Sequence, residues 1–165
     1  MDSYKYLKIR LNPDGSLYRY REVWLLPAAP AEELVAVEDE QGARRIVVHS
    51  SDVPLNAATC MGLRLFVSSG SGGHDGGRLP LVVYFHVGGY VLFHAASAPF
   101  HNTCAALAAA ALAIVASVDY RLAPEHCLPA AFEDAADAVI RGSDTHVMRG
   151  RGRRQLWIGG TEGRD

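Results

Sequence analysis

A histidine and two glycines that follow a short apolar run are the residues of this sequence best suited to chemistry. The string His86-Val87-Gly88-Gly89 comes directly after the run Leu81–Phe85. Glycine allows backbone N–H groups to approach an anionic oxygen, because it has no Cβ to block the way. Two such donors can stabilise the oxyanion of a tetrahedral intermediate. The pattern indicates an oxyanion hole at Gly88 and Gly89, and the open alternative is an ordinary tight turn after a strand.

A hydroxyl side chain near the end of the sequence is the candidate nucleophile. The sequence contains no Gly-x-Ser-x-Gly, the pattern that places a serine on a sharp turn between a strand and a helix. The nearest pattern is Gly159-Gly160-Thr161-Glu162-Gly163, which follows the apolar run Leu156–Ile158. Thr161 would take the nucleophile position, although its methyl group crowds the turn. A glycine-rich tail also produces this pattern by chance, so both interpretations stay open.

The elements that would position these residues are buried strands alternating with helices. The run Leu81–Phe85 is continuous and apolar, and Ala113–Val118 is apolar except for Ser117, as in strands that are buried on both faces. Between them a helix is predicted to begin at Ser97 as N-cap, pass through Pro99 and end near Ala111, because alanine favours helices.

A second helix is predicted to begin near Pro129. Its apolar residues recur with a 3.6-residue period and share one face. They are Phe132, Ala135, Ala136, Val139 and Ile140. Strand, helix, strand and helix in this order predict an α/β fold with a mainly parallel sheet.

The rest of the chain divides into an N-terminal segment and a tail around that centre. Residues 1–43 predict a hairpin, with Lys8–Leu11 and Leu17–Tyr20 joined through Asn12–Gly15, followed by a loop. Residues 44–140 hold the sheet and helices, and strands are expected at Arg45–His49 and, as a half-buried sheet edge, at Gly62–Ser68. A flexible connection is expected from Ser68 to Arg78. Residues 141–165 form a divergent tail rich in Arg and Gly, either a solvated basic tail or one that holds a third strand at Leu156–Ile158.

A long string after the second strand adds a family resemblance. The string is Asp119-Tyr120-Arg121-Leu122-Ala123-Pro124-Glu125-His126. Together with LPLVVYFHVGGY and the alanine-rich helix, it resembles the plant carboxylesterases of the hormone-sensitive-lipase-like α/β-hydrolase family. The resemblance runs from about Leu7 to Ile140, and plant gibberellin receptors, which keep the fold without esterase activity, look similar over the same stretch. It implies a single partial α/β-hydrolase domain over residues 1–165, the N-terminal half only.

The resemblance implies roles for the residues singled out above. The amides of Gly88 and Gly89 would form the oxyanion hole, and the segment Asp119–Glu125 would pack beneath their loop and brace it. His86 would order the loop, since in this family the general base comes from the far C-terminal part. The loop-shaping residues are then His86, Val87, Asp119, Tyr120 and Arg121.

One residue departs from the family pattern. Val87 replaces the first glycine after the histidine. A β-branched residue does not easily adopt a positive φ. If this position requires one, the loop is expected to be strained or shifted, and the donors to miss the oxyanion.

The acid and base of a catalytic triad are missing from the expected places. In this family they follow the nucleophile in chain order, and two residues follow Gly163. Asp134, Asp137, His126 and His146 precede Thr161 and do not fit that order. Three interpretations stay open: a carboxylic-ester hydrolase by family that is inactive as this truncated chain, a non-catalytic relative that binds a small ligand, and a fragment without function.

Composition excludes several other classes. With 165 residues, a formal charge of −2 and a pI near 6.4, the chain lacks the basic excess that nucleic acids or anionic membranes attract. The three cysteines form no Cys-x-x-Cys pair, so reduced, partly buried thiols and no metal site are expected. The longest apolar stretch, Ala105–Val118, is short for a membrane span and no leader opens the chain, which favours a cytoplasmic protein. The expected partner is a small-molecule ester or small acidic ligand, with no cofactor.

Overall fold

Two sheets are formed by the strands within the described part of the chain. The computed structural model describes residues 9–14, 17–19, 29–30, 33–38, 45–68, 80–142 and 156–159. Strands β1 (Ile9–Leu11) and β2 (Leu17–Arg19) pair antiparallel, which confirms the predicted hairpin. The predicted connection at 69–78 and most of the predicted tail, Thr161 included, lie outside the described residues.

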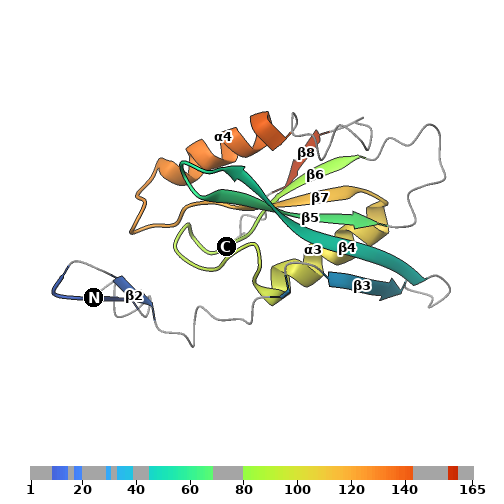
Figure 1. Ribbon diagram of the computed structural model, residues 1–165, viewed down its shortest axis with the longest axis horizontal. Coiled ribbons are helices and arrows are strands. Elements are labelled where there is room, and N and C mark those ends of the chain that lie inside the picture. The colour runs from blue at the N-terminus through green and yellow to red at the C-terminus, as the bar shows by residue number, and fades with distance from the viewer. Residues whose placement is uncertain are drawn as a thin grey trace, which may run out of the picture.

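Six further strands form one sheet in the order β3-β4-β5-β7-β6-β8 (Figure 1). Their bounds are β3 Glu33–Glu38, β4 Arg45–Asn56, β5 Met61–Ser68, β6 Leu81–Phe85, β7 Ile114–Asp119 and β8 Leu156–Gly159. Strand β6 pairs parallel with β7 and β8, whereas the β3–β4, β4–β5 and β5–β7 pairs are antiparallel. The sheet is therefore mixed, and the prediction of a mainly parallel sheet holds only for β6, β7 and β8. Strands β4 and β5 are joined by the turn at residues 57–60, whereas helix α3 forms the long crossover between the parallel strands β6 and β7.

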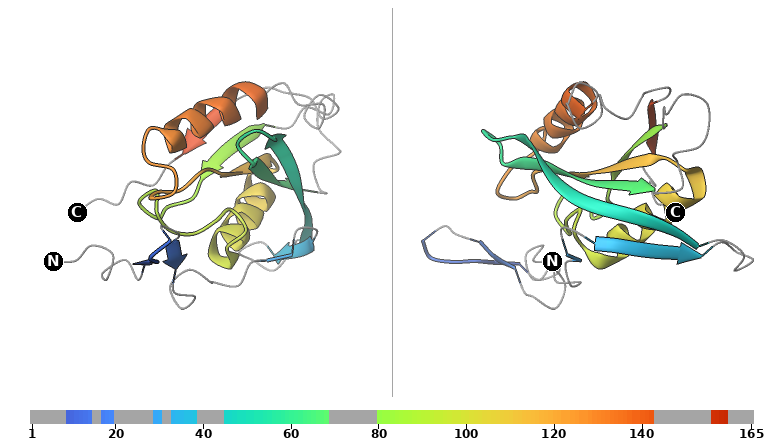
Figure 2. Two further views of the ribbon diagram at one scale, coloured as in Figure 1. Left: turned by 60° about the vertical axis from the view of Figure 1, so that its left-hand side comes forward. Right: turned by 45° about the vertical axis from the view of Figure 1, so that its right-hand side comes forward.

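The two helices cover opposite faces of this sheet (Figure 1, Figure 2). Helix α3 (Ala98–Ala111) packs with alternate strand residues such as Phe66 and Val115, and helix α4 (Ala130–Gly142) packs on the other face with Leu65 and Ala116. Strand β5 is buried on both faces between β4 and β7, so the half-buried edge predicted for Gly62–Ser68 is wrong. None of the helices within the described ranges is long and apolar enough to cross a membrane.

The start of α3 is nearly as predicted. Ser97 is the N-cap residue, and its carbonyl accepts hydrogen bonds from the amides of Phe100 and His101, both at 3.0 Å. Its hydroxyl makes no cap bond to the helix and instead accepts one from the amide of His94 at 3.2 Å. The side chain of Ser97 therefore holds the preceding loop rather than the helix.

Helix α4 does not bury the face that its periodicity predicted. Phe132 and Ile140 are 53% and 63% exposed, whereas Ala131, Asp134 and Ala138 are buried. The apolar face is left as a groove of about 390 Å³ beside β6, lined by Phe85, Ala135, Ala136, Val139 and Ile140.

Candidate oxyanion site

The candidate site is the tight turn that follows β6. Gly88 and Gly89 both have positive φ angles, +146° and +61°. A Cβ on Gly88 would lie 2.2 Å from the carbonyl oxygen of Leu92. The carbonyl of Gly88 accepts hydrogen bonds from the amides of Val91 at 3.2 Å and Leu92 at 3.0 Å. Both the backbone angle and the lack of space therefore require glycine at position 88.

The two amides of this turn have no acceptor among the described residues. The hydrogen bonds within that part of the chain include none donated by the backbone nitrogen of Gly88 or Gly89. A Cβ on Gly89 would meet nothing within 4 Å, so the space around this residue is open in the same part of the chain. This geometry is compatible with donation to an external oxygen.

Val87 fits this turn without a left-handed backbone. Its φ is not positive. The positive φ angles of this loop belong to Gly88, Gly89, Tyr90 and Phe93. The side chain of Val87 is 43% exposed. The strain that a required positive φ would have caused at this position is therefore absent.

His86 is buried beside the turn and its ring is fixed by Tyr120. The ring is stacked on that of Tyr120, with centroids 4.3 Å apart and 10° between the planes. Nδ1 lies 3.1 Å from the carbonyl oxygen of Val87, so it carries the proton of the neutral ring. Burial disfavours the charged ring and lowers the pKa of His86, although the hydrogen bond to Val87 acts in the opposite direction. His86 is thus a neutral positioning side chain.

The segment from Asp119, the last residue of β7, to Ala123 makes hydrogen bonds to the loop at three points. The hydroxyl of Tyr120 donates to the carbonyl oxygen of His86 at 2.7 Å. Asp119 Oδ1 accepts from the amide of Ala95 at 3.1 Å. The amide of Ala123 donates to the carbonyl oxygen of Tyr90 at 2.8 Å. Start, middle and end of the loop are each bonded to this one segment.

Asp119 is ionised in this position. Burial opposes its charge, but the hydrogen bonds from His94 and the Ala95 amide outweigh burial and lower the pKa of Asp119. His94 Nδ1 lies 3.6 Å from Asp119 Oδ1.

Arg121 joins the same segment to α4 and does not face the turn. Its backbone amide donates to Asp134 Oδ2 at 2.8 Å, and its Nε and Nη2 donate to the same carboxylate at 3.0 and 2.9 Å. Asp134 is 2% exposed. The hydrogen bonds with Asp134 raise the pKa of Arg121. This pair anchors the segment that braces the loop.

A separate cavity of about 330 Å³ lies between the β4–β5 hairpin and the far end of the loop. Ala95, Ala96 and Asp119 form one side, and Met61–Arg64 and Asp52 form the other. No sequence motif predicted this cavity. Among the described residues, no group of His, Cys, Asp or Glu side chains is arranged to hold a metal ion.

All three cysteines are free thiols. Cys104 is buried, and burial raises the pKa of its thiol to about 12. Cys60 and Cys127 are exposed, so the expected partial burial applies to Cys104 alone.

The third strand expected in the tail is present as β8. Its last residue, Gly159, pairs with Tyr84 of β6 in parallel register. The chain therefore leaves β8 at the edge of the sheet where the Gly88–Gly89 turn begins. Thr161 itself lies outside the described residues.

The comparisons with known proteins agree with this arrangement. A family model described as "alpha/beta hydrolase fold" matches residues 82–161. The chain thus has the α/β-hydrolase type of fold over part of its length and is similar to plant carboxylesterases. It is 43% identical over 139 residues to Probable carboxylesterase 8 of Arabidopsis thaliana, a match that covers 84% of this chain and 36% of the relative. With Carboxylesterase 20 of the same plant it shares 38% identity over 153 residues, 90% of this chain and 44% of the relative.

A solved esterase has the same fold over part of its length. The hyperthermophilic esterase of the archaeon Pyrobaculum calidifontis superposes with a TM-score of 0.53 at 37% identity, over 67% of this chain and 33% of the esterase. The chain thus spans well under half the length of these relatives.

Proposed function

We propose that these residues are the oxyanion-loop part of a carboxylic-ester hydrolase. In this mechanism a hydroxyl attacks the ester carbonyl, and the amides of Gly88 and Gly89 donate to the oxygen that becomes negatively charged. The observation that carries the proposal is the turn itself, with glycine required at position 88 and two amides without an acceptor in the described chain. Similarity to plant carboxylesterases supports the reaction type.

We assign Thr161 to the nucleophile position of this proposal. The family match extends to residue 161. The strand that precedes Thr161 lies beside β6 in parallel register, the arrangement that a nucleophile and an oxyanion loop require. His86, Val87, Asp119, Tyr120 and Arg121 keep their proposed roles in shaping the loop.

The 165 residues on their own are expected to show no turnover. They contain no Gly-x-Ser-x-Gly, and no histidine follows Thr161. A nucleophilic hydroxyl without a base stays protonated and weak. Incubation with a short-acyl p-nitrophenyl ester should give the same rate for the chain and for its Thr161→Ala variant. Hydrolysis that depends on Thr161 would contradict this expectation, and saturable binding of a small acid without hydrolysis would favour the receptor-like alternative.

A chimera tests the oxyanion assignment directly. Residues 81–142 of this chain would replace the equivalent segment of Arabidopsis thaliana Carboxylesterase 20, which supplies the remaining sequence. The folded chimera should hydrolyse the chromogenic ester. Gly88→Ala should lower kcat by about 10²–10³-fold, because the added Cβ meets the Leu92 carbonyl and shifts the turn, and misplacing one oxyanion donor costs about as much as losing it. Ile140→Ala, at an exposed position away from the turn, is the matched control. A folded chimera that is inactive, or one that Gly88→Ala leaves unchanged, would contradict the proposal.

A further inference from the structure

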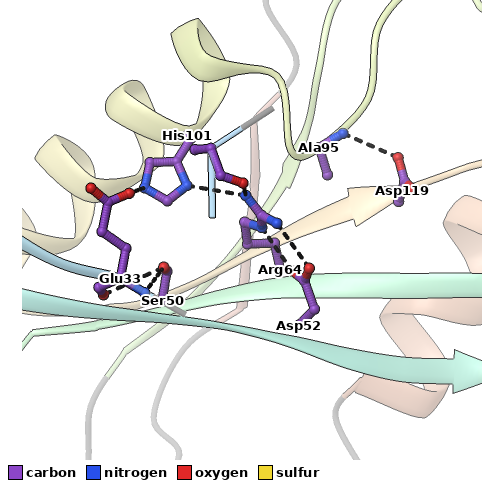
Figure 3. A network of polar contacts seen from close by, with 8 residues as sticks. Glu33, Ser50, Asp52, Arg64, Ala95, His101 and Asp119 are labelled. Carbon is purple, nitrogen blue, oxygen red and sulfur yellow. Dashed lines mark hydrogen bonds and ion pairs between the residues drawn. The ribbon is translucent and has the colours of Figure 1, made fainter. Parts of the chain in front are cut away.

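A buried arginine on β5 joins segments from four parts of the chain (Figure 3). Arg64 is 4% exposed. Its Nε and Nη2 donate to the two carboxylate oxygens of Asp52 on β4 at 2.7 and 2.8 Å. Its Nη1 donates to the carbonyl oxygen of Ala29 at 2.9 Å and lies 3.3 Å from Nδ1 of His101 on α3. One guanidinium thus holds two strands, a helix and the chain before β3.

These contacts define the protonation state of His101. The side chain of Arg64 can only donate, so Nδ1 of His101 must accept and the ring proton must sit on Nε2. Nε2 lies 3.3 Å from the Glu33 carboxylate on β3, and the ring of Phe66 packs edge-on against the imidazole, with centroids 5.0 Å apart. Burial and the charge of Arg64 lower the pKa of His101, against the smaller opposing effects of Glu33 and Asp52. His101 is therefore neutral at neutral pH.

The residues Ala29–Pro30 form a strap between this network and the loop of the candidate site. The carbonyl oxygen of Ala29 accepts from Arg64, and its amide donates to the carbonyl oxygen of Ala96 at 2.9 Å. Ala96 belongs to the loop that begins with the two glycines, and with Arg64 and Asp52 it lines the 330 Å³ cavity. The strap therefore connects the chain before β3 to the far end of the loop.

We propose that the contact between Arg64 and His101 is an acid-sensitive latch that holds this strap. Protonation of His101 puts a second N–H on Nδ1, so that two donors and two positive charges face each other across 3.3 Å. The guanidinium cannot lose its proton. The attraction between His101 and the carboxylate of Glu33 then draws the imidazole away from Arg64. The guanidinium shifts toward Asp52, and its bond to Ala29 is lost. The strap then separates from Ala96 and the wall of the cavity loosens.

The pH range in which the latch opens follows from the direction in which the pKa of His101 is shifted. The contact needs the neutral ring, which is complete above the ordinary histidine pKa of 6.5. Its folded-state pKa lies below that value, so the latch opens only as the pH falls further. The charged groups that face the ring are Arg64, Asp52 and Glu33.

Amide hydrogen exchange of Ala29, measured by NMR on the 165-residue chain, tests the latch. The protection factor of this amide should fall about tenfold between pH 7.5 and pH 5.0, since local opening follows protonation. His101→Gln should keep its protection at both pH values, because the amide oxygen of glutamine accepts from Arg64 and cannot be protonated in this range. The exposed residue His126 provides the control, and His126→Gln should behave like the parent chain.

The ring of His101 in the parent chain gives a second measurement if the variant does not fold. Its ¹⁵N shifts should show the Nε2–H tautomer at pH 7.5 and a titration that follows the loss of Ala29 protection. An Nδ1–H tautomer would overturn the proposal. Constant protection of Ala29 in the parent chain, or equal loss of protection in His101→Gln, would overturn it as well.

Discussion

The Gly88–Gly89 loop and the Arg64–His101 network hold the same end of the sheet by different means. The loop is fixed by a short contiguous string, because Asp119, Tyr120 and Ala123 bond to its end, start and middle. The network joins residues that are 12, 35 and 37 positions apart in the sequence. A contiguous string is visible as a motif, whereas a network of distant residues is visible only after folding.

The two regions also differ in the interactions that a substitution removes. The loop depends on backbone geometry at two glycines and on single hydrogen bonds, one of which is accepted by the ionised Asp119. The network depends on one buried charge that satisfies three acceptors. Substitutions in the network should therefore cost more stability than substitutions in the brace of the loop.

Removal of the buried arginine should have the largest effect. Arg64→Ala leaves Ala29, Asp52 and His101 without their common donor. Loss of one partner from a buried ion pair costs about 3–5 kcal/mol, and because Asp52 is half exposed we expect about 2–4 kcal/mol. Chemical denaturation measures this loss. The matched control is Arg141→Ala, whose exposed pair with Asp137 at 3.2 Å should contribute about 0–0.5 kcal/mol; equal losses would remove the distinction between the two arginines.

Substitution by alanine should destabilise the chain by different amounts at the two glycines. Gly88→Ala puts a Cβ 2.2 Å from a backbone oxygen at φ +146° and should destabilise the chain by about 2–3 kcal/mol. Gly89→Ala meets no atom within 4 Å, so only the left-handed backbone counts, at about 1 kcal/mol. Thermal melts of both variants measure the order. If Gly89→Ala were the more harmful, the description of the turn would be incorrect.

Loss of the Tyr120 hydroxyl should have a smaller effect on stability. Tyr120→Phe keeps the stacked ring but leaves the buried carbonyl of His86 without its 2.7 Å donor. An unsatisfied buried carbonyl costs about 1–3 kcal/mol. In the chimera the same variant should lower kcat more than it raises KM, because the loop is held less firmly. Unchanged kcat together with lower stability would make Tyr120 a purely structural residue.

Acid should weaken the fold modestly through His86. Its pKa is lowered in the folded chain, so the unfolded chain binds the proton first as the pH falls below the ordinary value of 6.5. Stability should not change through His86 above that pH and should decline as the pH falls below it. His86→Gln should flatten this part of the pH profile relative to His126→Gln. A profile that rises toward acid pH would contradict a neutral, buried His86.

The sequence predicted the centre of the sheet better than its N-terminal part. Strands β6 and β7 and helix α3 follow from apolar runs and alanine content, and the string His86–Gly89 indicated the turn. Strand β3 was missed, because its residues ELVAVE are a short run between loop-like segments. Its partner β4 lies close in sequence, but local patterns do not reveal the antiparallel pairing.

Arg64 was missed for a related reason. An arginine between Leu63 and Leu65 looks like the solvent side of an alternating strand, yet the side chain is buried because Asp52, Ala29 and His101 satisfy it. The prediction for helix α4 was wrong in the opposite way. Its large apolar residues were expected inside, but Asp134 is buried in their place by its bonds to Arg121. In both cases a distant polar partner decided which side chain was buried.

NMR titration of the Gly88 and Gly89 amides with butyrate tests the central claim most directly, since a carboxylate oxygen stands in for the oxyanion. Both amide protons should shift downfield and saturate together, and Gly88→Ala should abolish the response. Unchanged shifts for both amides in the folded chain, or slow exchange that shows them already bonded within the protein, would contradict an oxyanion-binding turn.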